Sequence, residues 1–284
     1  MSQSKTFKVG DFTLSRDILA EGYAGKIIKA HYTPHNSIVA VKMVSLTSAK
    51  KKTAYETEAH ICHVCKLNPH SIPVRKLFTR DNMGFISMQL FDTTLFKLIE
   101  QKKRLSTRRS VCFFNQITKG VEYMHNFNIA HLNLSPHNIL ISSRDSNAYI
   151  SDFGNSFYLE NNQNISEGLY QLGSRGLEGF QAPEVVTPGS FYNPIAADIW
   201  SLGVLLLLMV TGFYFANDAV AVELGTIQGI QPDCMDLLSK MIVVDPKRRI
   251  PLAEVLKHNF ITTNLPAERG NRSPMGRFRR LLRN

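Results

Sequence analysis

Two short polar clusters near the middle of the chain carry side chains whose types and spacing could do chemistry. The first reads HLNLSPHN, residues 131–138, and the second reads SDFG, residues 151–154. Both clusters carry amide or carboxylate side chains, Asn133, Asn138 and Asp152 among them. Asn133 carries a neutral amide that does not titrate, so it cannot serve as a general base. A turn-rich link, residues 142–147, joins the two clusters.

The order and spacing of the clusters resemble the eukaryotic protein kinase family. That family's pattern is H-R-D-L-K-P-x-N, followed about a dozen residues later by D-F-G. Three informative positions differ, because the chain has Leu132 for arginine, Asn133 for the catalytic aspartate and Ser135 for lysine. The resemblance covers about residues 12–262 through several motifs in the right order, so we expect the family's fold.

The resemblance implies that Asn133 and Ser135 occupy the catalytic positions. Loss of a general base costs about 10²–10⁴ in rate, and Asn133 could still orient a substrate hydroxyl by hydrogen bonding. Ser135 removes a cation that would stabilise the transferring phosphoryl group. The two losses need not multiply, since such residues act as a unit. We therefore predict impaired phosphoryl transfer.

Other motif positions are retained. Asn138 and Asp152 match the family's two metal-binding positions, which hold Mg²⁺ beside the nucleotide phosphates. Lys42 ends a VAVK sequence in the predicted strand 38–44 and matches the lysine that holds the α- and β-phosphates. Its partner should be Glu58 on the predicted helix 50–67, with Glu56 as the alternative. The resemblance thus implies that binding of ATP and Mg²⁺ is retained.

The predicted phosphate loop lies between two predicted strands, 12–19 and 26–32. The family's glycine-rich pattern corresponds here to Ala20, Gly22, Gly25 and Ile27. Glycine lets backbone N–H groups approach phosphate oxygens without an intervening side chain. A plain hairpin turn is the alternative interpretation. The remaining residues that the resemblance places around the nucleotide are Ala40, Met88, Gln89, Phe91 and Leu140.

Further motifs predict the scaffold of a large helical lobe. Residues 105–126 have a helical period of apolar side chains, and residues 195–216 are mostly apolar. We interpret the latter as a buried core helix rather than a membrane span, because it contains the family's D-x-W-S-x-G sequence from Asp198. That resemblance implies that Asp198 accepts backbone N–H bonds from the catalytic loop, and that Arg249 pairs with Glu184.

The segment from 154 to 184 corresponds to the family's activation segment and contains no threonine. Leu177 stands where serine/threonine kinases place a threonine that contacts the catalytic aspartate and lysine. Leu132 removes the arginine that would hold a phosphorylated segment. The positions of the family's catalytic aspartate, its neighbouring lysine and this threonine contact one another, and here all three differ. They are Asn133, Ser135 and Leu177.

Composition and cysteine usage limit the remaining interpretations. The chain has 284 residues, 44% hydrophobic residues, four cysteines and a formal net charge of +10. Its first ten residues are mostly polar and contain no apolar run, so we expect no secretory signal, and we expect a cytoplasmic or nuclear location. Cys62 and Cys65 lie three apart beside His60 and His63, a spacing that zinc could use. Buried thiols are the preferred interpretation, because no second C-x-x-C sequence exists.

The carboxyl-terminal residues 263–284 form an arginine-rich tail. From 266 to 284 there are six arginines and one glutamate, or +5. The alternatives are a nuclear address, an anionic membrane or RNA contact, a docking peptide and a solvated tail.

The predicted fold is α+β and bilobal, with a small antiparallel β lobe containing one helix and a larger, mainly α-helical lobe. We expect an extension at 1–11, a small lobe at 12–91, a large lobe at 92–262 and the tail. The preferred function is an ATP-binding serine/threonine pseudokinase that regulates or scaffolds protein partners. The alternatives are a slow but active serine/threonine kinase, and a nucleic-acid-binding protein that uses its tail. Whether the chain is an enzyme stays open.

Overall fold

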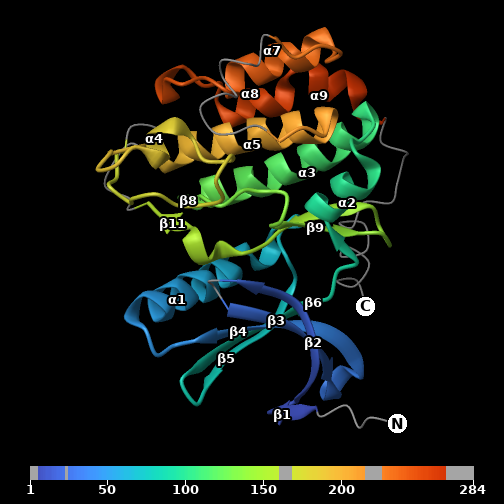
Figure 1. Ribbon diagram of the computed structural model, residues 1–284, viewed down its shortest axis with the longest axis vertical. Helices are drawn as coiled ribbons and strands as arrows, with labels where there is room; N and C mark the ends of the chain where they lie inside the picture. The colour runs from blue at the N-terminus through green and yellow to red at the C-terminus, as the bar shows by residue number, and fades with distance from the viewer. Residues whose placement is uncertain (1–5, 23–24, 160–167, 215–225, 267–284) are drawn as a thin grey trace, which may run out of the picture.

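A six-stranded antiparallel sheet forms the amino-terminal lobe of the computed structural model, which describes residues 6–22, 25–159, 168–214 and 226–266 (Figure 1). The strand order is β1-β2-β3-β4-β6-β5. The strands are β1 (Phe7–Val9), β2 (Phe12–Gly22), β3 (Gly25–Tyr32), β4 (Ser37–Ser45), β5 (Val74–Arg80) and β6 (Met83–Gln89). A short 3₁₀ helix, η1 (Thr33–His35), joins β3 to β4. β1 lies in the segment that the sequence suggested as an extension, yet it pairs with β2.

The two faces of the sheet bury different sets of side chains, because successive residues of a strand point to opposite sides. Val39 and Val41 of β4 pack with Phe12 in a small outer cluster. Ala40 and Val44 belong to the main core, which continues into the rest of the molecule. The alternation places Lys42 on the same inner face as Ala40, where it faces the second lobe.

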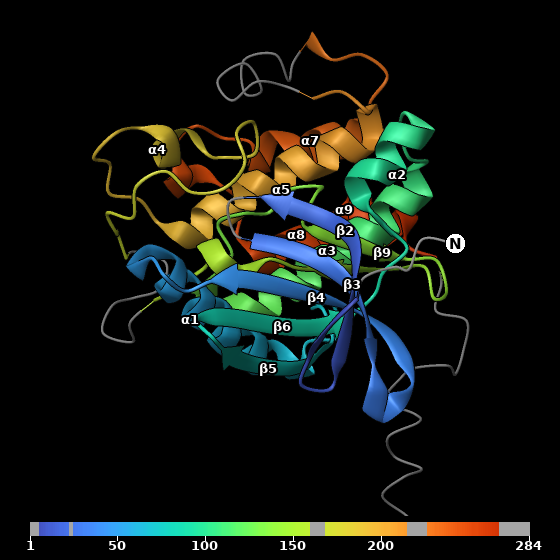
Figure 2. The ribbon, with the colours of Figure 1, turned by 60° about the horizontal axis from the view of Figure 1, so that its bottom comes forward.

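Helix α1 (Ala49–Val64) packs beside the sheet and continues into the 3₁₀ turn η2 (Cys65–Leu67). Figure 2 turns the sheet toward the viewer and shows α1 behind its strands. Tyr55 is the main anchor, because its ring covers Gly84 and its hydroxyl donates to the carbonyl oxygen of Phe78 at 3.0 Å. A side chain at position 84 would overlap the Tyr55 ring, so β6 needs glycine there.

The second lobe is mainly helical and is coloured from green to red in Figure 1. Its helices are α2 (Leu95–Lys102), α3 (Thr107–Asn126), α4 (Pro183–Val186), α5 (Pro194–Thr211), α7 (Pro232–Met241), α8 (Leu252–Lys257) and α9 (Asn259–Asn264). Its short strands are β7 (Thr93–Thr94), β8 (Ile129–Ala130), β9 (Ile139–Ser142), β10 (Asn147–Ile150) and β11 (Phe157–Tyr158). Two 3₁₀ turns, η3 (Phe153–Asn155) and η5 (Pro246–Arg248), complete the lobe. The bilobal α+β fold predicted from the sequence is confirmed.

Helix α5 passes through the middle of the helical lobe (Figure 1). It is the one helix among the described residues that is long and apolar enough to span a membrane by length and composition, and 78% of it is buried inside the protein. The side chain of Asn193 caps its first turn by accepting from the N–H groups of Ile195 and Ala196. This packing agrees with the core helix predicted from the sequence.

A buried ion pair ties the end of the helical lobe to α4. The Arg249 guanidinium donates to both carboxylate oxygens of Glu184, at 2.6 and 2.7 Å. The same guanidinium lies 5.1 Å from the centre of the Trp200 ring on α5. Bidentate pairing fixes orientation as well as distance. The predicted Arg249–Glu184 pair is therefore present.

Candidate functional site

A lysine–glutamate ion pair forms the centre of the candidate site. β4 carries Lys42 and α1 carries Glu58, and the Lys42 Nζ atom donates to the two Glu58 carboxylate oxygens at 2.9 and 2.7 Å. Both residues are buried, with 5% and 2% of their surfaces exposed. Glu56 is exposed on the other side of α1. The structure thus selects Glu58 rather than Glu56 as the partner, which the sequence left open.

The same lysine reaches across to the helical lobe. Its Nζ atom donates to the Oδ1 atom of Asp152 at 2.7 Å. Burial alone would lower the pKa of Lys42, but the charges of Glu58 and Asp152 outweigh it and raise that pKa above its ordinary value. Burial acts to raise the pKa of Asp152, and Lys42 overcomes this effect, so the carboxyl pKa lies below its ordinary value. Burial raises the pKa of Glu58 above its ordinary value, although the charge of Lys42 acts to lower it. Lys42 and Asp152 are therefore charged at neutral pH.

Asp152 owes its position to an uncommon backbone conformation. It follows β10 and has φ +63°, in the left-handed region, immediately before η3. Non-glycine residues adopt this region at a cost and keep it only where their surroundings impose it. Phe153, fully buried next to it, packs edge-on against His131 at 5.5 Å between ring centres. The buried phenylalanine thus anchors the turn that presents the Asp152 carboxylate.

Asn133 also binds Asp152. Its Nδ2 atom donates to the Asp152 Oδ2 atom at 3.0 Å, so the side chain at the catalytic position points at the carboxylate predicted to hold metal. The backbone N–H of Asn133 donates to the His131 Nδ1 atom at 3.1 Å, and the His131 Nε2 atom bonds the carbonyl oxygen of Ser151. Burial lowers the pKa of His131 below its ordinary value, which fits these two roles of a neutral imidazole.

Asn138 stabilises the loop of residues 131–138, which we call the catalytic loop, by a hydrogen bond within it. Its Nδ2 atom donates to the carbonyl oxygen of Asn133 at 2.8 Å, which leaves its side-chain oxygen as the ligand atom. Its backbone carbonyl accepts from the N–H and hydroxyl groups of Ser151, next to Asp152. The amide oxygen and the carboxylate are hard donors that fit Mg²⁺. Asp152 would have to share its oxygens between the metal and two existing hydrogen bonds.

Asp198 holds the start of this loop from α5. Its carboxylate accepts from the N–H of His131 at 2.7 Å and from the N–H of Leu132 at 2.8 Å. A third donor is the His125 Nε2 atom, at 2.9 Å. Leu132 has φ +57°, a left-handed conformation that costs an L-residue energy. The predicted bonds from Asp198 to the loop are thus present, and they stabilise a strained backbone.

Ser135 and Leu177 lie where the resemblance would place a lysine and a threonine. Ser135 is buried, with 1% of its surface exposed, while Leu177 is 36% exposed. Leu177 and Asn133 line one small cavity of about 10 Å³, which has room for about one water molecule. The segment carrying Leu177 approaches so closely that a side chain at Gly176 would come within 2.6 Å of the Leu132 carbonyl oxygen.

The predicted phosphate loop is a tighter hairpin than expected. β2 and β3 extend into it, so that Ala20 pairs with Ile27 and Gly22 pairs with Gly25. Gly25 has φ +126°, and a side chain there would overlap the carbonyl oxygen of Met43 on β4. This glycine is therefore required by the approach of β3 to β4, whether or not a phosphate binds. Residues 23 and 24, at the tip, lie outside the described residues.

The residues predicted around the nucleotide base lie on neighbouring elements. Ala40 of β4 is directly opposite Met88 of β6, and both are buried. The N–H of Gln89 donates to the carbonyl oxygen of Pro73 at 3.1 Å, so this N–H is already paired. The other members are Ile27 on β3, Phe91 after β6 and Leu140 on β9, all half-buried. Their roles toward a nucleotide stay predictions.

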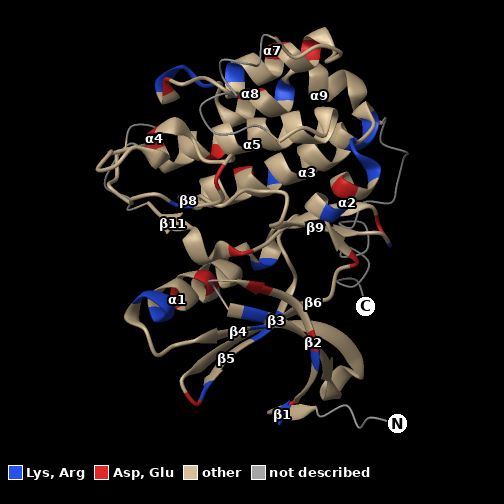
Figure 3. Cartoon of the chain, viewed as in Figure 1, with Lys and Arg blue, Asp and Glu red and all other residues tan. Residues whose placement is uncertain are grey.

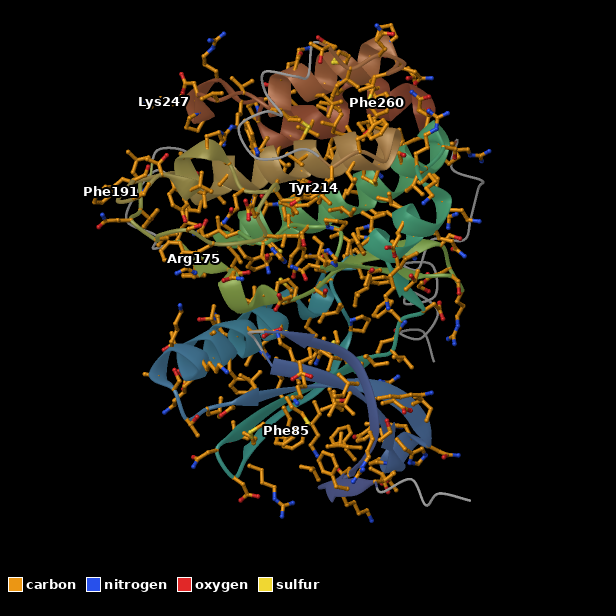
Figure 4. All side chains as sticks on the ribbon, in the orientation of Figure 1. Phe85, Arg175, Phe191, Tyr214, Lys247 and Phe260 are labelled. Atoms are coloured by element: carbon orange, nitrogen blue, oxygen red, sulfur yellow. The ribbon has the colours of Figure 1, made fainter. Side chains whose placement is uncertain are left out.

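Two side-chain to backbone hydrogen bonds in the activation segment were not predicted from the sequence. The Arg175 guanidinium donates to the carbonyl oxygen of Asn155 at 2.9 Å, and the Gln181 amide donates to the carbonyl oxygen of Arg175 at 3.0 Å. Figure 4 shows Arg175 at the lower edge of the helical lobe, facing α1. A cavity of about 850 Å³ lies between α1 and this segment. One feature of the sequence could have singled out Arg175. It is an arginine in the activation segment of a chain that has Leu132 in place of the family's phosphate-binding arginine.

The cysteine–histidine sequence of α1 does not form a metal site. Cys62 and Cys65 are buried, whereas His60 and His63 are exposed. In the part of the chain that the structure describes, no cluster of three or more His, Cys, Asp or Glu side chains could hold a metal ion. Burial raises the pKa of the Cys65 thiol to about 12, as expected of an inert structural thiol.

Charged residues are spread over both lobes. Figure 3 shows lysines gathered at the start of α1, where Lys50, Lys51 and Lys52 follow one another. The arginine-rich part of the tail, residues 267–284, lies outside the described residues. Its predicted anionic partner therefore stays a prediction.

A small antiparallel lobe, a helical lobe and a Lys–Glu–Asp network joining them define a protein-kinase-like domain. A family model described as protein kinase domain matches residues 12–261. This chain therefore belongs to the protein kinase family.

Several curated proteins are similar over most of the chain. The chain is 29% identical over 262 residues to the SNF1-like protein kinase ssp2 of Schizosaccharomyces pombe, covering 88% of this chain and 44% of that protein. It is 27% identical over 269 residues to the carbon catabolite-derepressing protein kinase of Saccharomyces cerevisiae, covering 91% and 41%. A protein of the same name from Secale cereale is 29% identical over 264 residues, covering 88% and 51%. The chain thus spans about half the length of these relatives, or less.

Proposed function

We propose that this protein binds ATP between its two lobes and acts as a serine/threonine-type pseudokinase, a regulator or scaffold with impaired phosphoryl transfer. The observation that carries the proposal is the intact network of Lys42, Glu58 and Asp152 beside an amide at position 133. Lys42 corresponds to the cation that contacts the nucleotide phosphates in kinases. Asp152 corresponds to the carboxylate that holds their Mg²⁺. Asn133 supplies no general base, and Ser135 supplies no cation for the transferring group.

The residues predicted at the nucleotide site have distinct roles in this function. Lys42 binds the α- and β-phosphates, Glu58 orients Lys42, and Mg²⁺ is held by Asn138 and Asp152 when it is bound. The adenine lies against Ala40 and the other predicted base-contacting residues. The domain runs over residues 12–262, with the lobes joined near residue 91, and its partners are proteins in the cytoplasm or nucleus.

Thermal unfolding with and without Mg²⁺-ATP tests the binding half of this proposal. At 100 times its dissociation constant a ligand stabilises the folded state by about 2.7 kcal/mol. For a domain of this size that raises the melting temperature by roughly 5–10 °C. The variant Lys42→Ala, compared with its own ligand-free baseline, should lose the shift. No shift in the parent protein would reject ATP binding and leave a scaffold.

A slow but active kinase is the second candidate, and three observations favour it. The Lys42–Glu58 pair is closed, and the similar proteins above are named as protein kinases. Asn133 also keeps its side-chain oxygen as an acceptor for a substrate hydroxyl, because only its Nδ2 atom donates to Asp152. Measurable transfer of the γ-phosphate to a protein substrate, lost in Asp152→Ala, would favour this candidate.

A further inference from the structure

Both oxygens of the Asp152 carboxylate are already hydrogen-bonded within the protein. The Lys42 Nζ atom donates to Oδ1 at 2.7 Å, and the Asn133 Nδ2 atom donates to Oδ2 at 3.0 Å. The Asp152 side chain is 27% exposed, so a ligand can reach it. A carboxylate has about four acceptor sites, so a cation that coordinated Asp152 would share the carboxylate with both donors.

An aspartate at position 133 would create a different site. Its carboxylate would lie about where the Asn133 amide lies, 3.0 Å from an oxygen of Asp152. Two carboxylates that close repel strongly, and Lys42, which is already paired with Glu58, would have to offset both of them. The Asn133 amide removes the second negative charge and presents an N–H group to the first. The residue at 133 therefore sets how much the site needs a divalent cation.

A charge count leads to the same conclusion. Lys42 contributes one positive charge and Asp152 one negative charge, so this pair sums to zero. An aspartate at position 133 would make the sum −1. A less negative site repels the phosphates of a nucleotide less in the absence of a counter-ion. Asp152 is also held in place by its two donors before any ligand arrives.

We propose that Asn133 replaces part of the function of the divalent cation at Asp152, so that this protein binds nucleoside di- and triphosphates with little dependence on Mg²⁺. This inference rests on the proposed ATP binding and deepens it. Asn133 then determines whether the protein binds the free nucleotide as well as its Mg²⁺ complex. The substitution then has a binding consequence that is separate from the loss of a general base.

The test is ATP binding by isothermal titration calorimetry, once in Mg²⁺ and once in excess EDTA. The parent protein should have dissociation constants within about threefold of each other in the two conditions, less than 1 kcal/mol apart. Asn133→Asp should bind at least about tenfold more weakly in EDTA than in Mg²⁺. A loss of more than about threefold in the parent protein would overturn the inference.

The chain offers a matched control far from the site. The Asn259 Nδ2 atom donates to the Asp233 Oδ2 atom at 2.9 Å on the exposed surface, which is the same kind of contact. Asn259→Asp should therefore leave the ratio of the two dissociation constants at its parent value. If Asn133→Asp fails to fold, Asn133→Ala decides, because it removes the donor without adding a charge. An unchanged ratio in Asn133→Ala would then contradict the inference.

The outcomes separate this inference from the proposed function. Binding in Mg²⁺ but not in EDTA by the parent protein leaves the proposed function standing and rejects the inference. Absence of ATP binding in both conditions rejects the proposed function and, with it, the inference. Binding in both conditions by the parent and in Mg²⁺ alone by Asn133→Asp supports both.

Discussion

Replacement of Asp198 by asparagine should destabilise the protein by about 1–5 kcal/mol. The carboxylate is fully buried and accepts three hydrogen bonds, two of them from the backbone of His131 and Leu132. An asparagine has one acceptor oxygen, so at least one buried N–H must face the new amide nitrogen. A hydrogen bond to a charged group contributes about 1.5–3 kcal/mol, and one between neutral groups contributes about half of that.

The estimate follows from these contacts. Loss of one charge-assisted bond and weakening of the other two by about half should cost about 3–6 kcal/mol. Leu132, released from its left-handed conformation, should return about 1–2 kcal/mol, which gives the net value. Urea denaturation followed by circular dichroism measures the free energy of unfolding. The same experiment shows whether the transition remains a single cooperative step.

Asp236→Asn is the matched control. Asp236 also pairs with Lys240 and a histidine, at 2.6 and 2.9 Å, but its side chain is 53% exposed. Exposed ion pairs contribute about 0–1 kcal/mol, so this variant should remain within 1 kcal/mol of the parent. If Asp198→Asn costs no more than Asp236→Asn, Asp198 does not hold the catalytic loop and the reasoning is wrong.

Three further predictions concern stability. Gly25→Ala should cost more than about 1 kcal/mol, because the β4 carbonyl blocks a side chain there, whereas Gly22→Ala should change stability by less than about 0.5 kcal/mol. Glu184→Gln should cost about 3 kcal/mol, because it leaves the buried Arg249 guanidinium without its counter-ion. Stability should fall as the pH drops below about 6.5, because the pKa of buried His131 is lowered on folding and the unfolded chain binds the proton more tightly.

The same urea titrations check these three predictions. Equal unfolding free energies for Gly25→Ala and Gly22→Ala would show that the β3–β4 approach does not require glycine. A Glu184→Gln variant as stable as the parent would mean that the ion pair is not needed for folding. For the histidine, the parent should lose stability between about pH 7.5 and pH 5.5 more steeply than His131→Gln. Parallel pH profiles would assign the loss to other groups.

Much of the site could be predicted because it depends on short motifs whose internal spacing is fixed. Lys42 in VAVK predicted a cation on the inner face of a strand, and Asp198 predicted an acceptor for loop N–H groups. Both interactions are present in the structure. The choice between Glu58 and Glu56 was not resolved, because two residues on one helix differ by about half a turn and need the packing of the helix to be told apart.

Features that depend on contacts between distant residues could not be predicted. The bond from Asn133 to Asp152 joins residues 19 apart and depends on the left-handed backbone at Asp152. β1 was assigned to an extension, because a three-residue strand carries too little periodicity to be recognised. Arg175 was not singled out in the sequence, although its guanidinium donates to backbone carbonyl oxygens within the activation segment.

The most direct test of the central claim is a single-turnover measurement of γ-phosphate loss from bound, labelled ATP. The parent protein is compared with the double variant Asn133→Asp, Ser135→Lys, both saturated with Mg²⁺-ATP and a generic protein substrate. Retained binding with impaired transfer predicts that the double variant reacts at least about 100-fold faster than the parent. Equal rates at equal ATP occupancy would contradict the claim, because residues 133 and 135 would then not limit phosphoryl transfer.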